Sequence, residues 1–190
     1  MTKLSYYTAT TLDGFIADPD DSLDWLLRQE QDTAGPLNYD EFIMTIGAIV
    51  MGSTTYEWIL GHEGATGAPW PYSMPAWVMT SRTMKPPADA DVRFASGDVR
   101  PVYDAMVGAA DGKDLWVVGG GELVGLFADA GLLDELIVYV APVTLGAGRS
   151  LLTRRLDLEL LETHRNGAFV ASRYAVVGKL KEDQPTGESS

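Results

Sequence analysis

Short apolar runs alternate with helical stretches along most of this chain, and this alternation constrains the fold more than any other feature. The apolar runs at residues 46–51, 76–80, 114–118 and 135–140 are continuous and short, which is typical of strands buried on both faces of a sheet. Further strands are expected at residues 4–11 and 92–95, and helices at residues 39–45, 53–59, 99–110 and 122–130. The pattern predicts an α/β fold with a mostly parallel central sheet and helices on both faces.

The end of the chain follows a different pattern. Residues 156–162 begin with apolar–polar alternation, residues 169–177 are expected to form a second strand, and Asn166-Gly167 between them is a strong hairpin-turn signal. An antiparallel hairpin is therefore predicted at one edge of the sheet. We expect residues 1–180 to form a single domain, because no linker or internal repeat interrupts them. Residues 181–190 are polar and are expected to form a disordered tail.

The residue types that the chain lacks exclude several kinds of site. It has no cysteine, so disulfides, thiolate nucleophiles and cysteine-held zinc or iron–sulfur centres are excluded. The two histidines, His62 and His164, stand far apart in the sequence. We therefore expect no metal site and no Ser-His-Asp triad.

The charge of the chain bears on its partners. A formal net charge of −13 arises from 27 acidic and 14 basic residues, and scattered basic residues would not hold a nucleic-acid backbone. No window approaches the ~18 apolar residues that a membrane span requires, and the N-terminus lacks the order of a signal peptide. The sequence predicts a cytoplasmic protein with a small-molecule partner, no nucleic acid and no membrane. An anionic ligand would need helix N-termini, backbone amides or a few arginines.

Two segments share the order of buried strand, glycine and helix start. They are Val50-Met51-Gly52-Ser53-Thr54-Thr55 and Val117-Val118-Gly119-Gly120-Gly121-Glu122. Glycine lets a phosphate approach the backbone, and the free amides of a helix start favour its negative charge. Neither segment is a dinucleotide fingerprint or a P-loop, because Val124 stands where a third glycine would be and no Gly-Lys-Ser/Thr occurs. Each alone is compatible with a simple tight turn, and the pair together is more specific.

Polar residues also close the strand at 76–80. Thr80-Ser81-Arg82 offers two hydroxyls and an arginine that can bind a phosphate in bidentate fashion, although a solvated strand end would have the same composition. At the start of the helix after Gly52, Thr54 and Glu57 have the spacing of a capping box.

Taken together, these segments resemble the dihydrofolate reductase superfamily, and within it the reductase domain of bifunctional riboflavin-biosynthesis deaminase–reductases and their stand-alone relatives. The matching pieces span most of the chain in the family's order. They are Leu12-Asp13-Gly14-Phe15-Ile16-Ala17, Leu23-Asp24-Trp25-Leu26, residues 50–57, residues 117–121, Asp134-Glu135-Leu136 and residues 141–148. The resemblance implies the three-layer dihydrofolate-reductase-like fold, and it also suggests a homodimer.

The resemblance further implies where ligands bind. Asp13, Gly14 and Ile16 match the mobile loop over the nicotinamide, and Gly146 and Gly148 match a segment on the substrate side. The remaining matches are to the binding site of NADPH: Gly52, Ser53, Thr54 and Thr55, then Thr80, Ser81 and Arg82 at the adenosine ribose, then Gly119, Gly120, Gly121, Glu122 and Leu123 over the pyrophosphate. The family commonly has an arginine where this chain has Ser53. NADH therefore stays open as an alternative cofactor.

The substrate side is less defined by the sequence. Trp25 is expected either to line the substrate pocket or to pack in the core. Glu30 and Asp32 lie near the place of the family's pterin-orienting carboxylate, yet a solvated helix face explains them equally simply. Trp70 and Tyr72 are interpreted as anchors of a loop, with a ring-capping role as the alternative. No proton donor is identified.

The resemblance implies an NADPH-dependent oxidoreductase that transfers a hydride to a C=N or C=O bond of a small planar heterocycle or ribosylamino-pyrimidine. The cofactor supplies the hydride, and the protein positions the reactants and excludes water. The alternative is a catalytically silent nucleotide-binding module on the same fold, which the serine at position 53 and the missing acid motivate.

Overall fold

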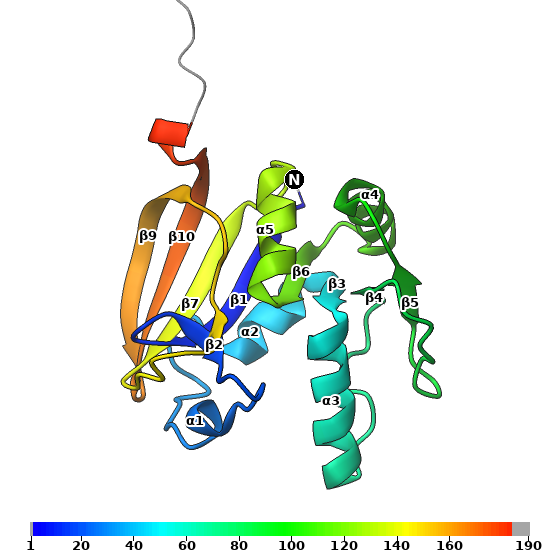
Figure 1. The fold of residues 1–190 in the computed structure, drawn as a ribbon, viewed down its shortest axis with the longest axis horizontal. Coiled ribbons are helices and arrows are strands. Elements are labelled where there is room, and N and C mark those ends of the chain that lie inside the picture. The colour runs from blue at the N-terminus through cyan, green and yellow to red at the C-terminus, as the bar shows by residue number, and fades with distance from the viewer. Residues whose placement is uncertain (1, 184–190) are drawn as a thin grey trace, which may run out of the picture.

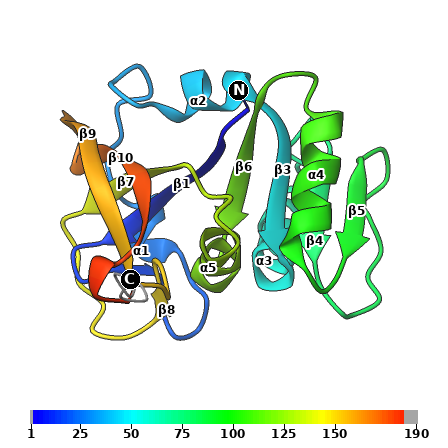
Figure 2. The same ribbon diagram turned by 90° about the horizontal axis from the view of Figure 1, so that it is seen from above.

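A computed structural model describes residues 2–183. An eight-stranded sheet of order β5-β4-β3-β6-β1-β7-β10-β9 forms the centre of the molecule (Figure 1). At one edge, β10 (Phe169–Lys179) pairs antiparallel both with β7 and with β9 (Leu156–Asn166). The mutually parallel strands are β1 (Leu4–Thr11), β3 (Ile46–Gly52), β4 (Ala76–Met79), β5 (Val92–Ala95), β6 (Asp114–Gly119) and β7 (Glu135–Ala141). The predicted mostly parallel sheet with an antiparallel edge is confirmed, and Figure 2 shows β5 and β9 at its opposite ends.

Helices cover both faces of the sheet, as the alternation predicts. On one face α4 (Val99–Ala109) and α5 (Gly121–Asp129) pack on a core that includes Tyr6. On the other face α1 (Asp24–Leu27), α2 (Tyr39–Thr45) and α3 (Ser53–Thr66) pack on a core that includes Tyr7. Tyr6 and Tyr7, which are adjacent in β1, thus pack in the two separate cores, because successive side chains of a strand point to opposite faces.

The C-terminal hairpin turns one residue later than the Asn166-Gly167 signal indicates. Asn166 ends β9 and pairs with Phe169, so the turn consists of residues 167 and 168. The side chain of Asn166 is buried and accepts a hydrogen bond from the Asp32 amide at 2.9 Å. Its Nδ2 donates to the carbonyl oxygens of Asp32 and Pro36. Asn166 therefore fixes the segment between α1 and α2 to the sheet.

A second, two-stranded sheet lies beside the main one and was not predicted. It pairs β2 (Phe15–Ala17) with β8 (Arg149–Ser150). The pairing joins the segment after β1 to the segment after β7, at the carboxyl ends of both strands. Beyond β10, residues 181–183 of the predicted tail form a short 3-10 helix, η1 (Lys181–Asp183). The other residues of the predicted tail lie outside the described part of the chain.

Within residues 2–183, no helix is both long enough and apolar enough to cross a membrane.

Candidate functional site

The two predicted glycine turns lie side by side. β3 and β6 are neighbours, and Met51 pairs with Gly119 at their carboxyl ends. α3 begins directly after Gly52, and α5 begins directly after Gly120. The ladder between the two strands shifts register just before this point, so Val118 lies opposite no residue of β3. Such an irregularity re-aims the strand ends and is common beside binding sites.

The backbone of these turns suits the close approach of a ligand. Gly119 has φ of +150°, a conformation that side-chain-bearing residues rarely adopt, and the peptide bond between Gly119 and Gly120 is cis. A Cβ added to Gly52 would point between the turns, 3.7 Å from the Gly119 carbonyl oxygen. Because these residues have no Cβ atoms, no side chain of theirs stands between the two turns at the junction of the strands.

The first turns of α3 and α5 lack side-chain caps within the described residues. The N-cap residues are Gly52 and Gly120, and neither helix has a side-chain hydrogen bond at its N-cap within the described residues. The predicted capping box of Thr54 and Glu57 is wrong: Gly52 is the N-cap, and Glu57 binds Arg82 instead. An uncapped helix start leaves donors that a phosphate can satisfy, with help from the helix dipole. Here two such starts meet at one edge of the sheet.

Side chains contribute unequally to this junction. Thr55 is half-buried, and its Oγ1 lies 3.6 Å from the position of a Cβ on Gly119. The carboxylate of Glu122 is bound by Arg154 and Thr153, and Leu123 is buried in the core with α4. Of the predicted cofactor contacts on α5, Glu122 and Leu123 can therefore offer only their backbone groups.

The Thr80-Ser81-Arg82 segment lies one strand further out. Gly52 pairs with Met79 at the end of β4, so this segment flanks the turn at α3. Arg82 donates to both carboxylate oxygens of Glu57, at 2.9 and 2.8 Å, and its amide donates to Thr80 Oγ1. The Arg82 guanidinium holds the pKa of the Glu57 carboxyl below its usual range. Arg82, which the sequence predicts to bind a phosphate, thus lies beside the α3 turn and already binds the carboxylate of Glu57.

The loop that contains Asp13 is hydrogen-bonded to the segment after β7. The Asp13 carboxylate accepts hydrogen bonds from Thr11 Oγ1 at 2.6 Å and from the amides of Gly146 at 2.7 Å and Leu145 at 3.0 Å. These bonds lower the pKa of Asp13, that from Thr11 most. A Cβ on Gly120 would lie 3.8 Å from Ile16 Cδ1. The loop after β1 therefore reaches both residues 145–146 and the α5 turn.

Gly146 and Gly148 shape this segment after β7. Both have positive φ, of +73° and +151°. A Cβ on Gly148 would clash with the carbonyl oxygen of Ala17 in β2, so the glycine permits the pairing of β2 with β8. The structure thus brings the loop of Asp13 and Ile16 together with the segment at 145–148.

The aromatic candidates pack in the core. Trp25 is 5% exposed and belongs to the same core cluster as Tyr7 and Ile49. Its Nε1 is buried and has no hydrogen-bond partner among the described residues. Trp70 contacts Tyr56 and Tyr72 edge-on or tilted, with ring centroids 5.7 and 5.3 Å apart. These rings anchor the segment after α3, which agrees with the loop-anchor interpretation.

Glu30 and Asp32 are exposed, and the bonds they make to the hairpin run through their backbone. The Glu30 carbonyl accepts from the Ala168 amide at 2.8 Å, and Asp32 contacts Asn166 through its own amide and carbonyl. Neither position is that of a buried, substrate-orienting carboxylate. No group of three or more metal-ligating side chains is found within residues 2–183.

Two hollows of the surface lie at the other edge of the sheet. One, of about 460 Å³, is lined by Ile46, Gly47 and Lys113 at the amino ends of β3 and β6. The other, of about 440 Å³, is lined by Ser5, Asp114 and Glu135 at the amino ends of β1, β6 and β7. Ligands of open α/β sheets bind at the carboxyl ends of the strands. We therefore place the candidate site at the glycine turns, despite the size of the hollows.

Comparison with known proteins identifies the family of the chain. Residues 2–168 match the family of the RibD C-terminal domain. The uncharacterized protein YwjB of Bacillus subtilis (strain 168) is 32% identical over 175 residues, which are 90% of this chain and 97% of YwjB. YyaP of the same organism is 26% identical over 82% of this chain and 84% of its own length.

Solved structures share the fold. A Shewanella sp. PV-4 protein provisionally assigned to riboflavin biosynthesis superposes with a TM-score of 0.77 at 24% identity, covering 92% of this chain and 99% of its own. The Thermotoga maritima diaminohydroxyphosphoribosylaminopyrimidine deaminase/5-amino-6-(5-phosphoribosylamino)uracil reductase superposes with a TM-score of 0.60 at 14% identity, over 92% of this chain and 56% of that one. The fold is therefore the dihydrofolate-reductase-like fold of RibD reductase domains, and the chain belongs to the RibD C-terminal domain family.

Proposed function

We infer that this protein is a reductase that binds a reduced nicotinamide dinucleotide across the carboxyl edge of β6, β3 and β4. The carrying observation is the pair of adjacent glycine turns whose helices, α3 and α5, both begin without a side-chain cap. Backbone amides after Gly52 and Gly120 would hold the pyrophosphate, and Thr80, Ser81 and Arg82 would face the adenosine ribose. NADPH is the proposed cofactor, with NADH as the alternative. When bound, the cofactor supplies the hydride.

The protein's part is to position the reactants and to exclude water. The Asp13 loop, fixed to residues 145–146, would cover the nicotinamide end from the side of β1 and β7. The proposed substrate carries a C=N or C=O bond in a small planar heterocycle or ribosylamino-pyrimidine. No described acidic side chain is placed as a proton donor at the turns, because Glu122 binds Arg154 and Asp13 is fully engaged.

The charges near the site favour a substrate without a phosphate group. Arg149 binds Asp21 at 2.6 and 3.0 Å, and Arg154 binds Glu122 and Asp129. These arginines are therefore already neutralised by carboxylates. The homodimer suggested by the family resemblance stays a prediction: light scattering of the purified chain tests it, and a monomeric mass would contradict it.

Titration of the purified protein with NADPH and NADH tests the proposal. Five tryptophans report binding through fluorescence quenching, and Trp116 lies on β6, three residues before Gly119. We expect saturable binding of at least one dinucleotide, and its oxidation when a substrate of the proposed class is added. Binding without turnover on a panel of pterins, pyrimidines and ribosylamino-pyrimidines would favour the catalytically silent module. No binding of either dinucleotide at millimolar concentration would overturn the proposal.

A further inference from the structure

The sequence did not predict that Glu57 and Arg82 form an ion pair. Glu57 is on the first turns of α3, and Arg82 follows β4, the neighbour of β3. The pair therefore links α3 to the segment after β4. This segment lies beside the Gly52 turn, on the side away from β6. This is the end of the site where an arginine is available for the adenosine ribose.

The geometry of the pair engages the end of the guanidinium. Nη1 donates to Oε1 at 2.9 Å and Nη2 to Oε2 at 2.8 Å, an arrangement in which two parallel bonds fix both planes. The Arg82 amide also donates to Thr80 Oγ1 at 3.0 Å, which fixes the backbone from which the side chain extends. The side chains are 53% and 47% exposed, so a ligand from solvent can reach them.

A carboxylate in this position discriminates between the two nicotinamide dinucleotides. The 2′-phosphate of NADPH would bring about two negative charges at neutral pH, would compete with Glu57 for the guanidinium and would be repelled by its carboxylate. The 2′-hydroxyl of NADH can instead donate a hydrogen bond to a carboxylate, the contact by which acidic residues recognise NAD in other nucleotide folds. Ser53, at the adjacent turn, adds no positive charge that would offset Glu57.

We propose that Glu57 tunes the cofactor preference of this protein: by engaging Arg82 and disfavouring a 2′-phosphate, it weakens the binding of NADPH relative to NADH. This inference rests on the proposed function, because it concerns the dinucleotide site described above. Glu57 acts here as a specificity-determining residue and takes no part in hydride transfer.

The test compares dissociation constants of NADPH and NADH for four proteins, measured by tryptophan fluorescence at low ionic strength, where exposed charges are least screened. In Glu57→Gln the amide keeps the size of the side chain and removes its charge. We expect NADPH to bind about tenfold more tightly relative to NADH in this variant. In the double variant Glu57→Gln/Arg82→Ala, most of the relative gain should vanish, because the freed guanidinium is its main source and the lost repulsion by the carboxylate supplies only the rest.

Asp91→Asn is the matched control. Arg93 also binds Asp91 through two hydrogen bonds, from Nε at 2.9 Å and from Nη2 at 2.8 Å, with similar exposure but at the amino end of β5. It changes the net charge of the chain by the same amount as Glu57→Gln and should leave the ratio of dissociation constants unchanged. Thermal unfolding of each variant verifies that the fold is intact.

The outcomes separate the two proposals. If both dinucleotides bind and Glu57→Gln leaves their ratio unchanged, the inference about Glu57 is wrong and the proposed function stands. If the full gain persists in the double variant, Arg82 is not its main source and the inference is also wrong. If neither dinucleotide binds the parent protein, the proposed function itself fails.

Discussion

The turns at α3 and α5 share one local pattern and differ in what surrounds them. At α3, a Cβ on Gly52 would lie 3.7 Å from the Gly119 carbonyl oxygen and 3.9 Å from the Gly120 nitrogen, which are ordinary contacts. At α5, a Cβ on Gly121 would clash with the Ser150 carbonyl oxygen and lie 2.7 Å from that of Leu151. The α3 turn is therefore open toward its neighbour, whereas the α5 turn is packed against a third segment of backbone.

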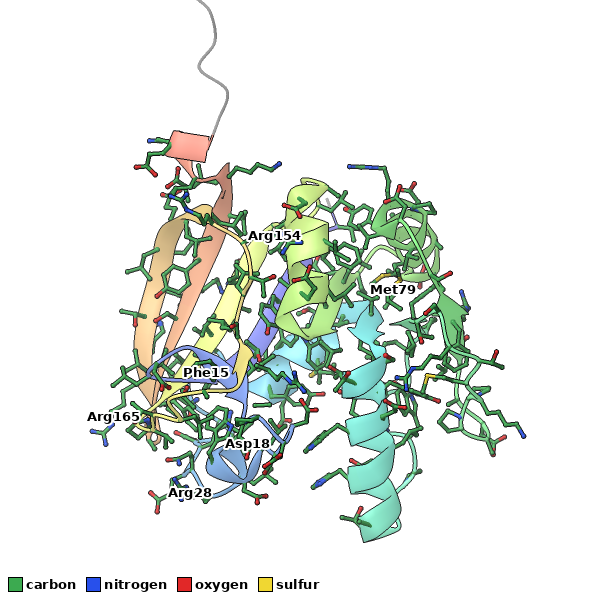
Figure 3. All side chains as sticks on the ribbon, viewed as in Figure 1. Phe15, Asp18, Arg28, Met79, Arg154 and Arg165 are labelled. Atoms are coloured by element: carbon green, nitrogen blue, oxygen red, sulfur yellow. The ribbon has the colours of Figure 1, made fainter. Side chains whose placement is uncertain are left out.

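The packing around α5 continues along the helix. Arg154, which Figure 3 shows against α5, binds Glu122 at 3.0 Å and Asp129 at 2.6 Å. A Cβ on Gly125 would lie 3.0 Å from Arg154 Cγ. The chain after β8 is thus held along the length of α5. A glycine after a strand can serve the approach of a ligand or the approach of another backbone, and the sequence pattern alone does not distinguish these needs.

Replacing Gly121 should produce the largest effect. The new methyl group of Gly121→Ala would meet backbone carbonyls of residues 150 and 151, which cannot rotate away as a side chain would. We expect a loss of about 3 kcal/mol in the free energy of unfolding, because overpacking against backbone forces the segments apart. Urea denaturation followed by circular dichroism measures this loss.

The control for this substitution is a helical glycine in open space. Gly108 is in α4, and nothing lies within 4 Å of a Cβ built on it. Gly108→Ala should raise stability by about 0.5–1 kcal/mol through helix propensity. If Gly121→Ala unfolds at the same urea concentration as the parent protein, the α5 turn is not tightly packed against residues 150 and 151, and the proposed difference between the two turns is wrong.

Replacing Gly52 should affect binding rather than stability. Its φ of −79° is accessible to alanine, and the nearest atoms leave room for a methyl group. In Gly52→Ala this methyl group would stand between the two turns, where the pyrophosphate is proposed to approach. We expect the dissociation constant of the dinucleotide to rise about tenfold, which corresponds to about 1.4 kcal/mol, with unfolding unchanged within about 0.5 kcal/mol.

Gly61, on α3 and with open space around its Cβ position, provides the comparison. Gly61→Ala should bind the dinucleotide as the parent protein does. Equal affinities of Gly52→Ala and Gly61→Ala would show that the opening between the turns is not where the cofactor lies. Fluorescence titration of both variants under identical conditions decides this.

The fold was predictable where its determinants are local. The strands of the parallel sheet are apolar runs, and a run such as residues 46–51 carries its own signal because both faces are buried. Because parallel strands end at one edge of the sheet, the place of both glycine turns at that edge also followed from the sequence, whereas the adjacency of β3 and β6 did not. The pairing of Phe15–Ala17 with Arg149–Ser150 was missed, because these strands are very short and lie far apart in the chain.

Side-chain roles that depend on distant partners were harder to predict. Glu57 has the spacing of a capping residue, yet it binds Arg82, 25 residues away, since an arginine offers a carboxylate two charge-assisted bonds. Asn166 has the sequence of a turn, yet its buried amide holds residues 32–36. In both cases a tertiary contact overrides a local preference, and only the topology reveals the partner.

The smallest expected effect concerns the Asp13 loop, which borders the packed turn at α5. Because hydrogen bonds from Thr11, Gly146 and Leu145 lower its pKa below 3.8, the ionised carboxylate holds the loop at neutral pH. The contact is lost only as pH falls through the lowered value in the folded protein. Protection of the Leu145 and Gly146 amides from hydrogen exchange, taken relative to the intrinsic rate at each pH, should therefore fall in acid before that of Val138, in the core strand β7. In Asp13→Asn the protection of these two amides should already be lower at neutral pH, with little further change on acidification. Loss of protection at all three amides together in the parent protein would instead indicate global unfolding and contradict a local role for Asp13.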